Sequence, residues 1–297
     1  MTDATKNRVK SILKIILKFG VSGLVIWYVF SKIDIRETWQ TICNANGWLV
    51  AAAIVVYSLS QIVAAIRLNI LFRTIPFYIS TLANIKLYWL GLFYNISLPG
   101  GVGGDGYKIY YLHKHHGQRV KALSALVLAD RLNGLCIIVI FLLLFASFFV
   151  ETLPFPYHKF YFLAVPLVLF GYWLFVRIFK HCALRAFWQV SLASVISQGL
   201  QMCSVMLILI SLVGTDCSFE NYIFLFFISS IASAIPITMG GAGAREATFL
   251  IGSQYLSTDP SVAIALSLMF YANSLICAVP GIIYALRPSL IEKSSKL

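Results

Sequence analysis

The residues Pro99-Gly100-Gly101-Val102-Gly103-Gly104-Asp105 interrupt an apolar stretch that extends from about residue 82 to about residue 112. A second apolar stretch, at about 221–257, is interrupted by Pro236-Ile-Thr-Met-Gly240-Gly241-Ala-Gly243-Ala-Arg245-Glu246. Glycine adopts the positive φ values that a tight turn needs, and proline ends a helix. Each interrupted stretch therefore predicts two short helices joined by a glycine-rich turn.

The rest of the chain is also apolar. Of its 297 residues, 60% are hydrophobic and 11% are charged, and the mean hydropathy is +0.85. Water-soluble domains are about 45 to 50% apolar and about 25% charged, so this composition predicts an integral membrane protein. Uninterrupted apolar segments near the ~20 residues that a spanning helix needs lie at about 12–30, 47–66, 122–150, 159–178, 187–213 and 262–286. We expect the first of these to be retained as a helix rather than cleaved as a signal peptide.

Little of the chain remains for a water-soluble catalytic domain, which excludes ATPase modules and cytosolic synthetase domains. The net charge of +12 must instead be distributed between the two sides of a membrane. If both interrupted stretches were single spans, the loop with Lys114, Arg119 and Lys121 would lie outside, against the positive-inside rule. We therefore predict that each interrupted stretch is a re-entrant hairpin that enters and leaves on one side.

This topology is an all-α polytopic fold with six full spans and two re-entrant hairpins, and it places both termini in the cytoplasm. Most basic residues then lie on the cytoplasmic side. They are Lys6, Arg8, Lys10, Lys14, Lys18, Arg67, Arg73, Lys86, Lys114, Arg119, Lys121, Arg177, Lys180, Arg185, Arg287, Lys293 and Lys296.

Charged residues of both signs, in equal number, remain at membrane depth in this topology. They are Asp105, Lys108, Asp130, Arg131, Arg245 and Glu246. A charge at the bilayer centre costs about 2.5 to 3.5 kcal/mol, so we expect these residues to face a protein-lined cavity and to pair with one another. The alternative is that they are ion pairs that only hold helices together, or that they lie nearer the lipid headgroups.

The order span, span, hairpin, span occurs in residues 12–150 and again, inverted, in residues 159–286 of a single membrane domain, 1–297. Transporters with such inverted repeats bind substrate near the membrane midplane, where broken helices meet. Helices that begin just after a glycine turn would direct N–H groups into the cavity, an arrangement suited to an anion such as phosphate. The alternative is that the glycines allow close helix packing.

Other motifs predict less. The run Gly101–Gly106 fits the dinucleotide pattern G-x-G-x-x-G, but an apolar helical segment precedes it where that motif needs a strand. His113, His115 and His116 favour a solvated cytoplasmic loop over a metal site. The cysteines are scattered without a C-x-x-C pair, which favours apolar packing. We therefore expect no catalytic residue, no metal and no cofactor.

The combination of PGGVGGD near residue 100, Asp130-Arg131 and IPITMGGAGARE at 235–246 resembles the flippase-like membrane region of the lysylphosphatidylglycerol synthase family. The resemblance covers nearly the whole chain. It implies a region that moves lipids across the bilayer, without the soluble aminoacyl transferase domain and its activity. The positions that match the family are Gly100, Gly101, Gly103, Gly104, Asp105, Arg131, Gly240, Gly241, Gly243, Arg245 and Glu246.

These observations lead us to expect a flippase or scramblase of the plasma (inner) membrane for an anionic or aminoacylated phospholipid, or a polyprenyl-phosphate-type lipid. A membrane enzyme that modifies lipid headgroups and a small-solute secondary transporter are the alternatives. The expected partner is the lipid substrate and not nucleic acid; a homodimer and a separate lipid-modifying enzyme are left open. The expected substrate-binding residues are Gly100, Gly101, Gly103, Gly104, Asp105, Lys108, Asp130, Arg131, Gly240, Gly241, Gly243, Arg245 and Glu246.

Overall fold

A computed structural model describes residues 20, 23–24, 27–97, 103–146, 161–179, 181–215, 217–234, 241 and 243–291. Within these ranges the regular structure is entirely helical, which confirms the predicted all-α class. The elements are α2 (Ile35–Cys43), α3 (Gly47–Phe72), α4 (Thr81–Ser97), α5 (Gly103–His116), α6 (Val120–Ala146), α7 (Tyr161–Phe179), the 3-10 helix η3 (His181–Ala186), α8 (Phe187–Val213), α9 (Phe219–Ala234), α10 (Ala244–Tyr255), α11 (Pro260–Ala278) and α12 (Gly281–Leu286).

Polar side chains mark where several of these helices begin. Asp34 caps α2 by accepting hydrogen bonds from the main-chain N–H groups of residues 36 and 37, and Asn46 caps α3 in the same way. Asp259 caps α11, and Pro260 follows at the first helical position, where a missing N–H costs nothing. The caps fix the start of each helix, because they satisfy N–H groups that have no partner within the helix.

Within the described residues, four helical segments are long and apolar enough to cross a membrane: Gly47–Phe72, Val120–Ala146, Ala183–Val213 and Pro260–Leu286. They correspond to four of the predicted spans. The segment predicted at 159–178 forms α7, whose apolar part is shorter, and most of the segment predicted at 12–30 lies outside the described residues. The total of six spans and two re-entrant hairpins stays a prediction.

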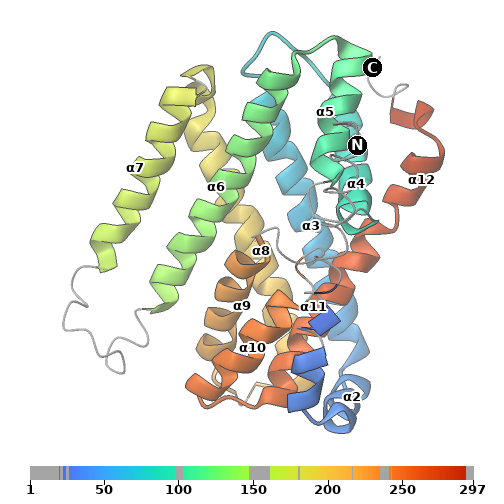
Figure 1. The fold of residues 1–297 in the computed structure, drawn as a ribbon, viewed down its shortest axis with the longest axis vertical. Helices are drawn as coiled ribbons and strands as arrows, with labels where there is room; N and C mark the ends of the chain where they lie inside the picture. Colours follow the sequence, from blue (N-terminus) through green and yellow to red (C-terminus); the bar gives the residue numbers. More distant parts are fainter. Residues whose placement is uncertain are drawn as a thin grey trace, which may run out of the picture.

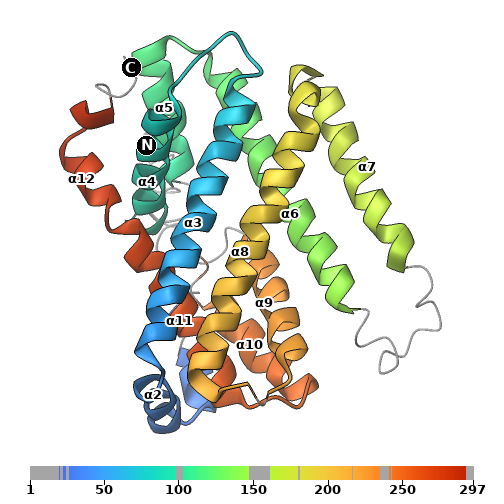
Figure 2. The same ribbon diagram turned by 180° about the vertical axis from the view of Figure 1, so that it is seen from behind.

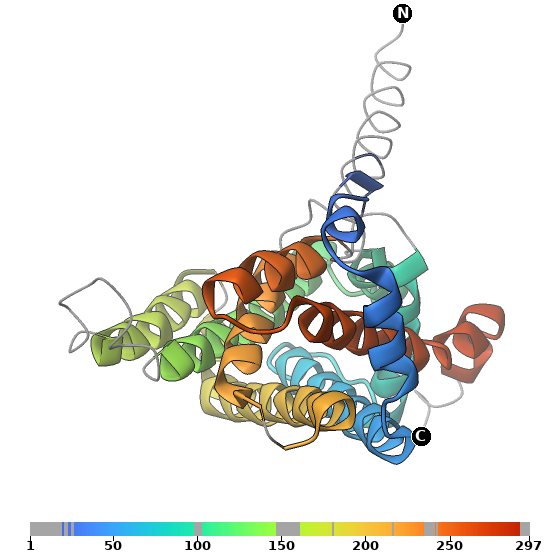
Figure 3. The ribbon, with the colours of Figure 1, turned by 90° about the horizontal axis from the view of Figure 1, so that it is seen from below.

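The long helices run the length of the molecule, and the shorter pairs occupy opposite ends of it. In Figure 1, α3 runs from the lower end to the upper end, and α8, which packs against it, runs back. The contacting helices α4 and α5 lie in the upper half, whereas α9 and α10, also in contact, lie in the lower half (Figures 1 and 2). Viewed from below in Figure 3, α11 passes through the middle of the molecule, where it contacts α2, α3, α4, α8 and α10.

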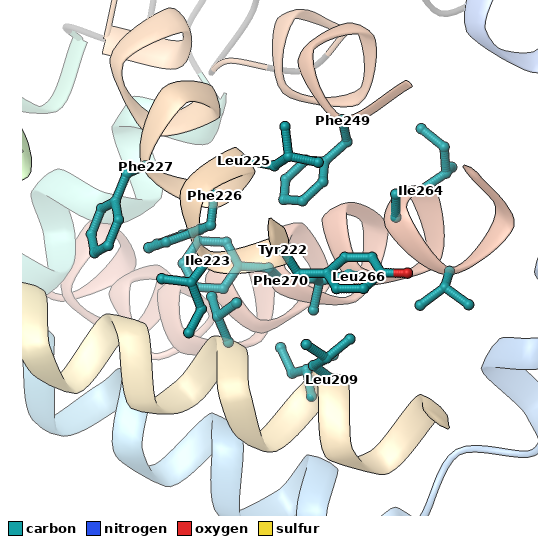
Figure 4. Packing of buried hydrophobic residues seen from close by; sticks show 14 of the residues in the cluster. Leu209, Tyr222, Ile223, Leu225, Phe226, Phe227, Phe249, Ile264, Leu266 and Phe270 are labelled. Atoms are coloured by element: carbon teal, nitrogen blue, oxygen red, sulfur yellow. The ribbon is translucent and has the colours of Figure 1, made fainter. Parts of the chain in front are cut away.

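The buried apolar side chains of the described residues form two clusters, one in each half. The lower cluster is built mainly by α9, α10 and α11, and Figure 4 shows Phe226, Phe249 and Phe270 within it. The rings of Phe226 and Phe270 meet edge to face, with their centroids 5.0 Å apart. The upper cluster includes Phe72, Leu87 and other side chains of α3 to α8. Each cluster packs one of the two short helix pairs against the long helices.

Between the two clusters lies a layer of buried polar residues. Along α3 it follows Tyr57 of the lower cluster and precedes Leu68 of the upper one; along α8 it lies between Val190 and Val205. The middle of α6 contributes residues of the same kind. The buried polar residues of this layer are Ser60, Gln61, Arg67, Asp130, Asn133, Ser191, Ser194, Ser197, Gln198 and Ser204. The charged site predicted from the sequence falls in and beside this layer.

Candidate functional site

The centre of the polar layer is an ion pair between α3 and α6. The Nε and Nη2 atoms of Arg67 lie 2.7 and 2.9 Å from Oδ1 and Oδ2 of Asp130, and both residues are 6% exposed. The third nitrogen, Nη1, donates to Ser194 Oγ of α8 at 2.8 Å. A buried pair of this kind is stable only when its remaining polar atoms are also satisfied. The Ser194 contact provides that and links three helices.

Asn133 extends this network between α6 and α8. Its Nδ2 donates to Ser191 Oγ at 3.2 Å, and its Oδ1 accepts from the Ser194 hydroxyl. Asn133 lies one turn after Asp130 on α6, so the two side chains project from the same face. The network therefore sets the register of α6 against α8 at the level of the ion pair.

Arg67 was predicted on the cytoplasmic side, and this prediction is wrong: its side chain is buried inside the polar layer. The predicted span ended at residue 66, whereas α3 continues through the apolar residues of its last turn to Phe72. Those apolar residues after Arg67 are the signal in the sequence that places it within the helix. The Arg131 side chain, by contrast, is 40% exposed, so among the described residues Arg67 takes the buried position that was expected for Arg131.

A second charged cluster lies where α5 approaches α6. Asp105 Oδ1 accepts from Lys108 Nζ at 3.1 Å, and Asp105 Oδ2 pairs with Arg131 Nε. The Lys108 ammonium also lies 4.0 Å from the centre of the Tyr88 ring, a cation–π contact with α4. The structure thus brings together Asp105, Lys108 and Arg131 as predicted, with Asp130 as the neighbour of Arg131 in the chain. Asp130, however, pairs with Arg67.

Gly104, in the first turn of α5, serves close packing. A Cβ on Gly104 would lie 1.8 Å from the main-chain oxygen of Gly91 on α4, so no larger residue fits there. The Gly104 N–H donates to Asn95 Oδ1 at 2.9 Å. The prediction that N–H groups at this turn are free is therefore wrong for Gly104, and the alternative of close packing holds for it. Gly103 also lies in this first turn, while Gly100 and Gly101 are outside the described residues.

The second glycine-rich turn leads into α10. Gly241 and Gly243 have φ values of +84° and +87°, which side chains other than glycine rarely adopt. Glu246, 5% exposed, closes the start of the helix by accepting from the Gly243 N–H at 2.7 Å, and its other oxygen accepts from Ser267 Oγ of α11 at 3.1 Å. Both donors are neutral, so the Glu246 carboxylate here positions α10 against α11. Gly240 is outside the described residues.

Arg245 differs from the other interior cations. Its guanidinium lies over the Phe270 ring, 5.0 Å from the ring centre. Within the part of the chain that the structure describes, its buried Nε and Nη1 atoms have no hydrogen-bond partner. Leaving buried donors of a charged group without acceptors costs more than about 1 to 3 kcal/mol, which makes this a site that can bind an anion favourably. Arg245 and Glu246 form a group of their own against α11, separate from the Arg67 and Asp105 pairs.

A cavity of about 410 Å³ adjoins the polar layer between α3, α6 and α8. Its volume falls within the range of small-molecule sites, roughly 300 to 1,000 Å³. Arg67 and Arg131 line it, and so does Ala234 at the end of α9, next to the second glycine-rich turn. The polar residues that the sequence analysis missed here are Gln61, Ser197, Gln198 and Gln201. Their signal in the sequence is the recurrence of amide and hydroxyl side chains inside otherwise apolar helices.

The histidines at the end of α5 make local contacts. His115 stacks on Tyr111 with ring centroids 4.4 Å apart, and His116 meets the edge of Phe77 at 5.2 Å. Among the described residues, no group of three or more His, Cys, Asp or Glu side chains is placed to hold a metal ion. The residues of the site are thus cations, carboxylates and amides suited to binding an anion through hydrogen bonds and charge.

Comparison with known proteins places this architecture in a family. The model of the transmembrane region of lysylphosphatidylglycerol synthase matches residues 15–281. The chain is also similar to a UPF0104 membrane protein of Pyrococcus horikoshii, with 26% identity over 138 residues, 46% of this chain and 40% of that protein. The chain thus matches less than half the length of that curated relative. Its long apolar helices and the family match indicate a multi-pass membrane protein. The resemblance predicted from the glycine-rich turns is confirmed: the chain belongs to the family of lysylphosphatidylglycerol synthase transmembrane regions.

Proposed function

We propose that this protein is a flippase or scramblase that moves an anionic or aminoacylated phospholipid, or a polyprenyl-phosphate-type lipid, across the plasma membrane. The observation that carries the proposal is Arg245, a guanidinium in the interior whose buried Nε and Nη1 atoms lack acceptors among the described residues. A lipid phosphate would supply those acceptors.

We propose that α4–α5 and α9–α10 are re-entrant hairpins that enter from opposite sides. Their positions in opposite halves of the molecule support this topology (Figures 1 and 2). So do the charges at the helix ends. Basic residues stand where α3 and α7 finish and where α6 and α8 begin; they are Arg73, Lys121, Arg177 and Arg185. Acidic residues stand where α2, α9 and α11 begin; they are Asp34, Glu37, Glu220 and Asp259.

By the positive-inside rule, the end with the basic residues is cytoplasmic, and both termini are proposed to lie on that side. The lipid headgroup then enters the polar layer while the acyl chains stay in the bilayer. Arg245 binds the phosphate, and Arg131 and Lys108 form a second group of cations along its path, whereas Asp105 and Asp130 hold the cations in place when the site is empty. The two halves of the repeat move against each other to open the site to either side.

Movement is either downhill or coupled to protons through one of the buried acids. The chain itself is proposed to carry out no chemistry on the lipid, and its partner is the lipid substrate. A membrane enzyme that modifies headgroups would form a new product from a supplied donor. Purified protein that converts a lipid in this way would contradict the proposal.

The proposal is tested with purified protein in vesicles that contain a lipid labelled on its acyl chain. Chemical quenching of the label in the outer leaflet measures how fast lipids cross. We expect Arg245→Gln to abolish protein-dependent crossing at unchanged expression and stability. Arg36→Gln, an exposed arginine of α2, is the matched control and should leave the rate unchanged. Crossing at the wild-type rate in Arg245→Gln would contradict the site assignment.

A further inference from the structure

The cavity beside the Arg67–Asp130 pair has two unlike walls. One wall, from α3 and α8, carries amides and a hydroxyl, and the other, from α6, carries aliphatic side chains at helical spacing. The aliphatic residues are Leu128, Leu132, Leu135 and Ile138. Leu128 is 49% exposed, so this wall continues to the outside of the helix bundle. A ligand that is polar at one end and apolar at the other, as a phospholipid is, matches both walls.

Gln198 is an amide on the polar wall of this cavity. It is only 7% exposed, and its Nε2 lies 3.8 Å from a Cβ built on Gly134 of α6. Buried amides are nearly always hydrogen-bonded, so an amide that borders a cavity is well placed to bind a ligand there. An amide both donates and accepts, and a hydroxyl group is the partner that can do the same in return.

Two donors converge on one point of the α6 surface. A Cβ built on Gly134 would lie 3.3 Å from Arg67 Nη1 and 3.8 Å from Gln198 Nε2. Both nitrogens therefore lie beside the same part of α6 at the cavity, where an oxygen atom of a ligand can accept from them. Phosphate and hydroxyl oxygens both meet this requirement. Arg131 lines the same cavity and brings a further positive charge.

The charges around the cavity disfavour a cationic ligand. Among the described residues that line it there is no carboxylate. Both oxygens of Asp130 are bound to Arg67, and both oxygens of Asp105 are bound to cations of α5 and α6. An ammonium group placed here would therefore be desolvated among like charges, with no anionic partner, which is costly.

We propose that the lipid taken up by this cavity is a phosphodiester whose headgroup carries hydroxyl groups and no cation, such as a glycerol or a sugar. This deepens the proposed function and rests on it. Among the lipid classes named under the proposed function, this inference favours anionic phospholipids with hydroxyl-bearing headgroups and disfavours aminoacylated ones. The phosphate binds Arg67 and Arg131, and the headgroup hydroxyls bind Gln198. The parts of the acyl chains nearest the headgroup lie along the leucines of α6.

The first test needs no variant. Wild-type protein in phosphatidylcholine vesicles is assayed with acyl-labelled phosphatidylglycerol, phosphatidylethanolamine and cationic ethylphosphatidylcholine. We expect phosphatidylglycerol to cross at least about tenfold faster than the cationic lipid, because only the latter places an unpaired cation in the cavity. Equal rates for the two lipids, both abolished by Arg245→Gln, would overturn this inference and leave the proposed function standing. Crossing of none of the lipids would overturn both.

The second test separates the hydroxyl contact from the phosphate contact. Gln198→Leu removes the amide and keeps a side chain of similar size. We expect it to slow phosphatidylglycerol about tenfold and to leave phosphatidic acid, which has a phosphate and no glycerol headgroup, within about twofold. Gln254→Leu, an exposed glutamine of α10, is the matched control and should change neither rate. An equal effect of Gln198→Leu on both lipids would contradict a role in binding hydroxyls.

Discussion

The buried pair between Arg67 and Asp130 gives the most direct test of the polar layer. Both side chains are 6% exposed and are joined by two hydrogen bonds of 2.7 and 2.9 Å. Arg67→Met leaves the Asp130 carboxylate buried without its cation, and Asp130→Leu leaves the guanidinium without its anion. Because breaking a buried pair strands a charge, we expect each single variant to lower the free energy of unfolding by about 3 to 5 kcal/mol.

The double variant, with Met at 67 and Leu at 130, distinguishes this reasoning from a simple loss of contacts. Replacing both charges with apolar groups of similar size is often neutral, so we expect the double variant to recover most of the stability lost by either single variant. The expected coupling between the two sites is therefore several kcal/mol, far above the ~0.5 kcal/mol within which independent sites add. Unfolding by denaturing detergent in mixed micelles, followed by circular dichroism, measures these free energies.

The same variants separate stability from transport. Arg67 also lines the cavity, so the double variant should be stable and yet cross lipids poorly in the vesicle assay. Arg36→Met, at an exposed position of α2, is the control and should stay within about 0.5 kcal/mol of wild type. Losses that simply add in the double variant, or single variants as stable as wild type, would refute the assignment of Arg67 and Asp130 as a coupled buried pair.

Three further predictions follow from other parts of the molecule. Gly104→Ala should destabilise the protein by several kcal/mol, because its Cβ would lie 1.8 Å from a main-chain oxygen of α4. Gly106→Ala is the control and should be tolerated, because a Cβ there meets open space. Unfolding in detergent compares the stability of the two variants. Burial, and then the neighbouring His115, lower the pKa of His116 below its usual 6.5. The unfolded chain therefore binds a proton more readily than the folded protein, and the free energy of unfolding should fall as the pH drops below about 6.5. His116→Phe should flatten this dependence when unfolding is measured across pH. The third prediction concerns topology and uses single cysteines in a cysteine-free background, with a membrane-impermeant maleimide added to whole cells. The reagent should label Thr215→Cys, beyond the end of α8, and should not label Gln118→Cys, beyond the end of α5. The reverse pattern would invert the proposed topology.

Composition and hydropathy predicted the all-helical class, because they are averaged over long segments, and the short glycine-rich motifs predicted the family. The partners of individual charges could not be predicted in the same way. Asp130 and Arg131 are adjacent in sequence, yet successive residues on a helix point about 100° apart and do not face each other. Asp130 thus reaches Arg67 on α3, while Arg131 reaches Asp105 on α5. Only the packing of helices decides such pairings.

Glycine motifs show the same division between what a sequence indicates and what packing decides. The glycine clusters correctly marked where α5 and α10 begin. Their roles differ, however. Gly104 allows contact with α4 and its N–H is bound to Asn95, whereas Gly241 and Gly243 supply the positive φ values of the second turn. A run of glycines indicates that something unusual for a helix occurs, and the neighbouring chain determines whether it is close approach or an unusual dihedral angle.

The polar layer itself argues for a binding site more strongly than for a purely structural role. In a purely structural layer every buried polar group would have a hydrogen-bond partner, and the Arg67 network with Ser194 and Asn133 comes close to that state. In the described structure, by contrast, the buried Nε and Nη1 atoms of Arg245 lack partners at the start of α10, and Gln198 lines the cavity beside the layer. Unsatisfied buried groups lower stability, so the buried donors of Arg245 without acceptors indicate that stability is given up for binding. The satisfied pairs hold the helices in register, and the unsatisfied groups are the ones left to meet a ligand.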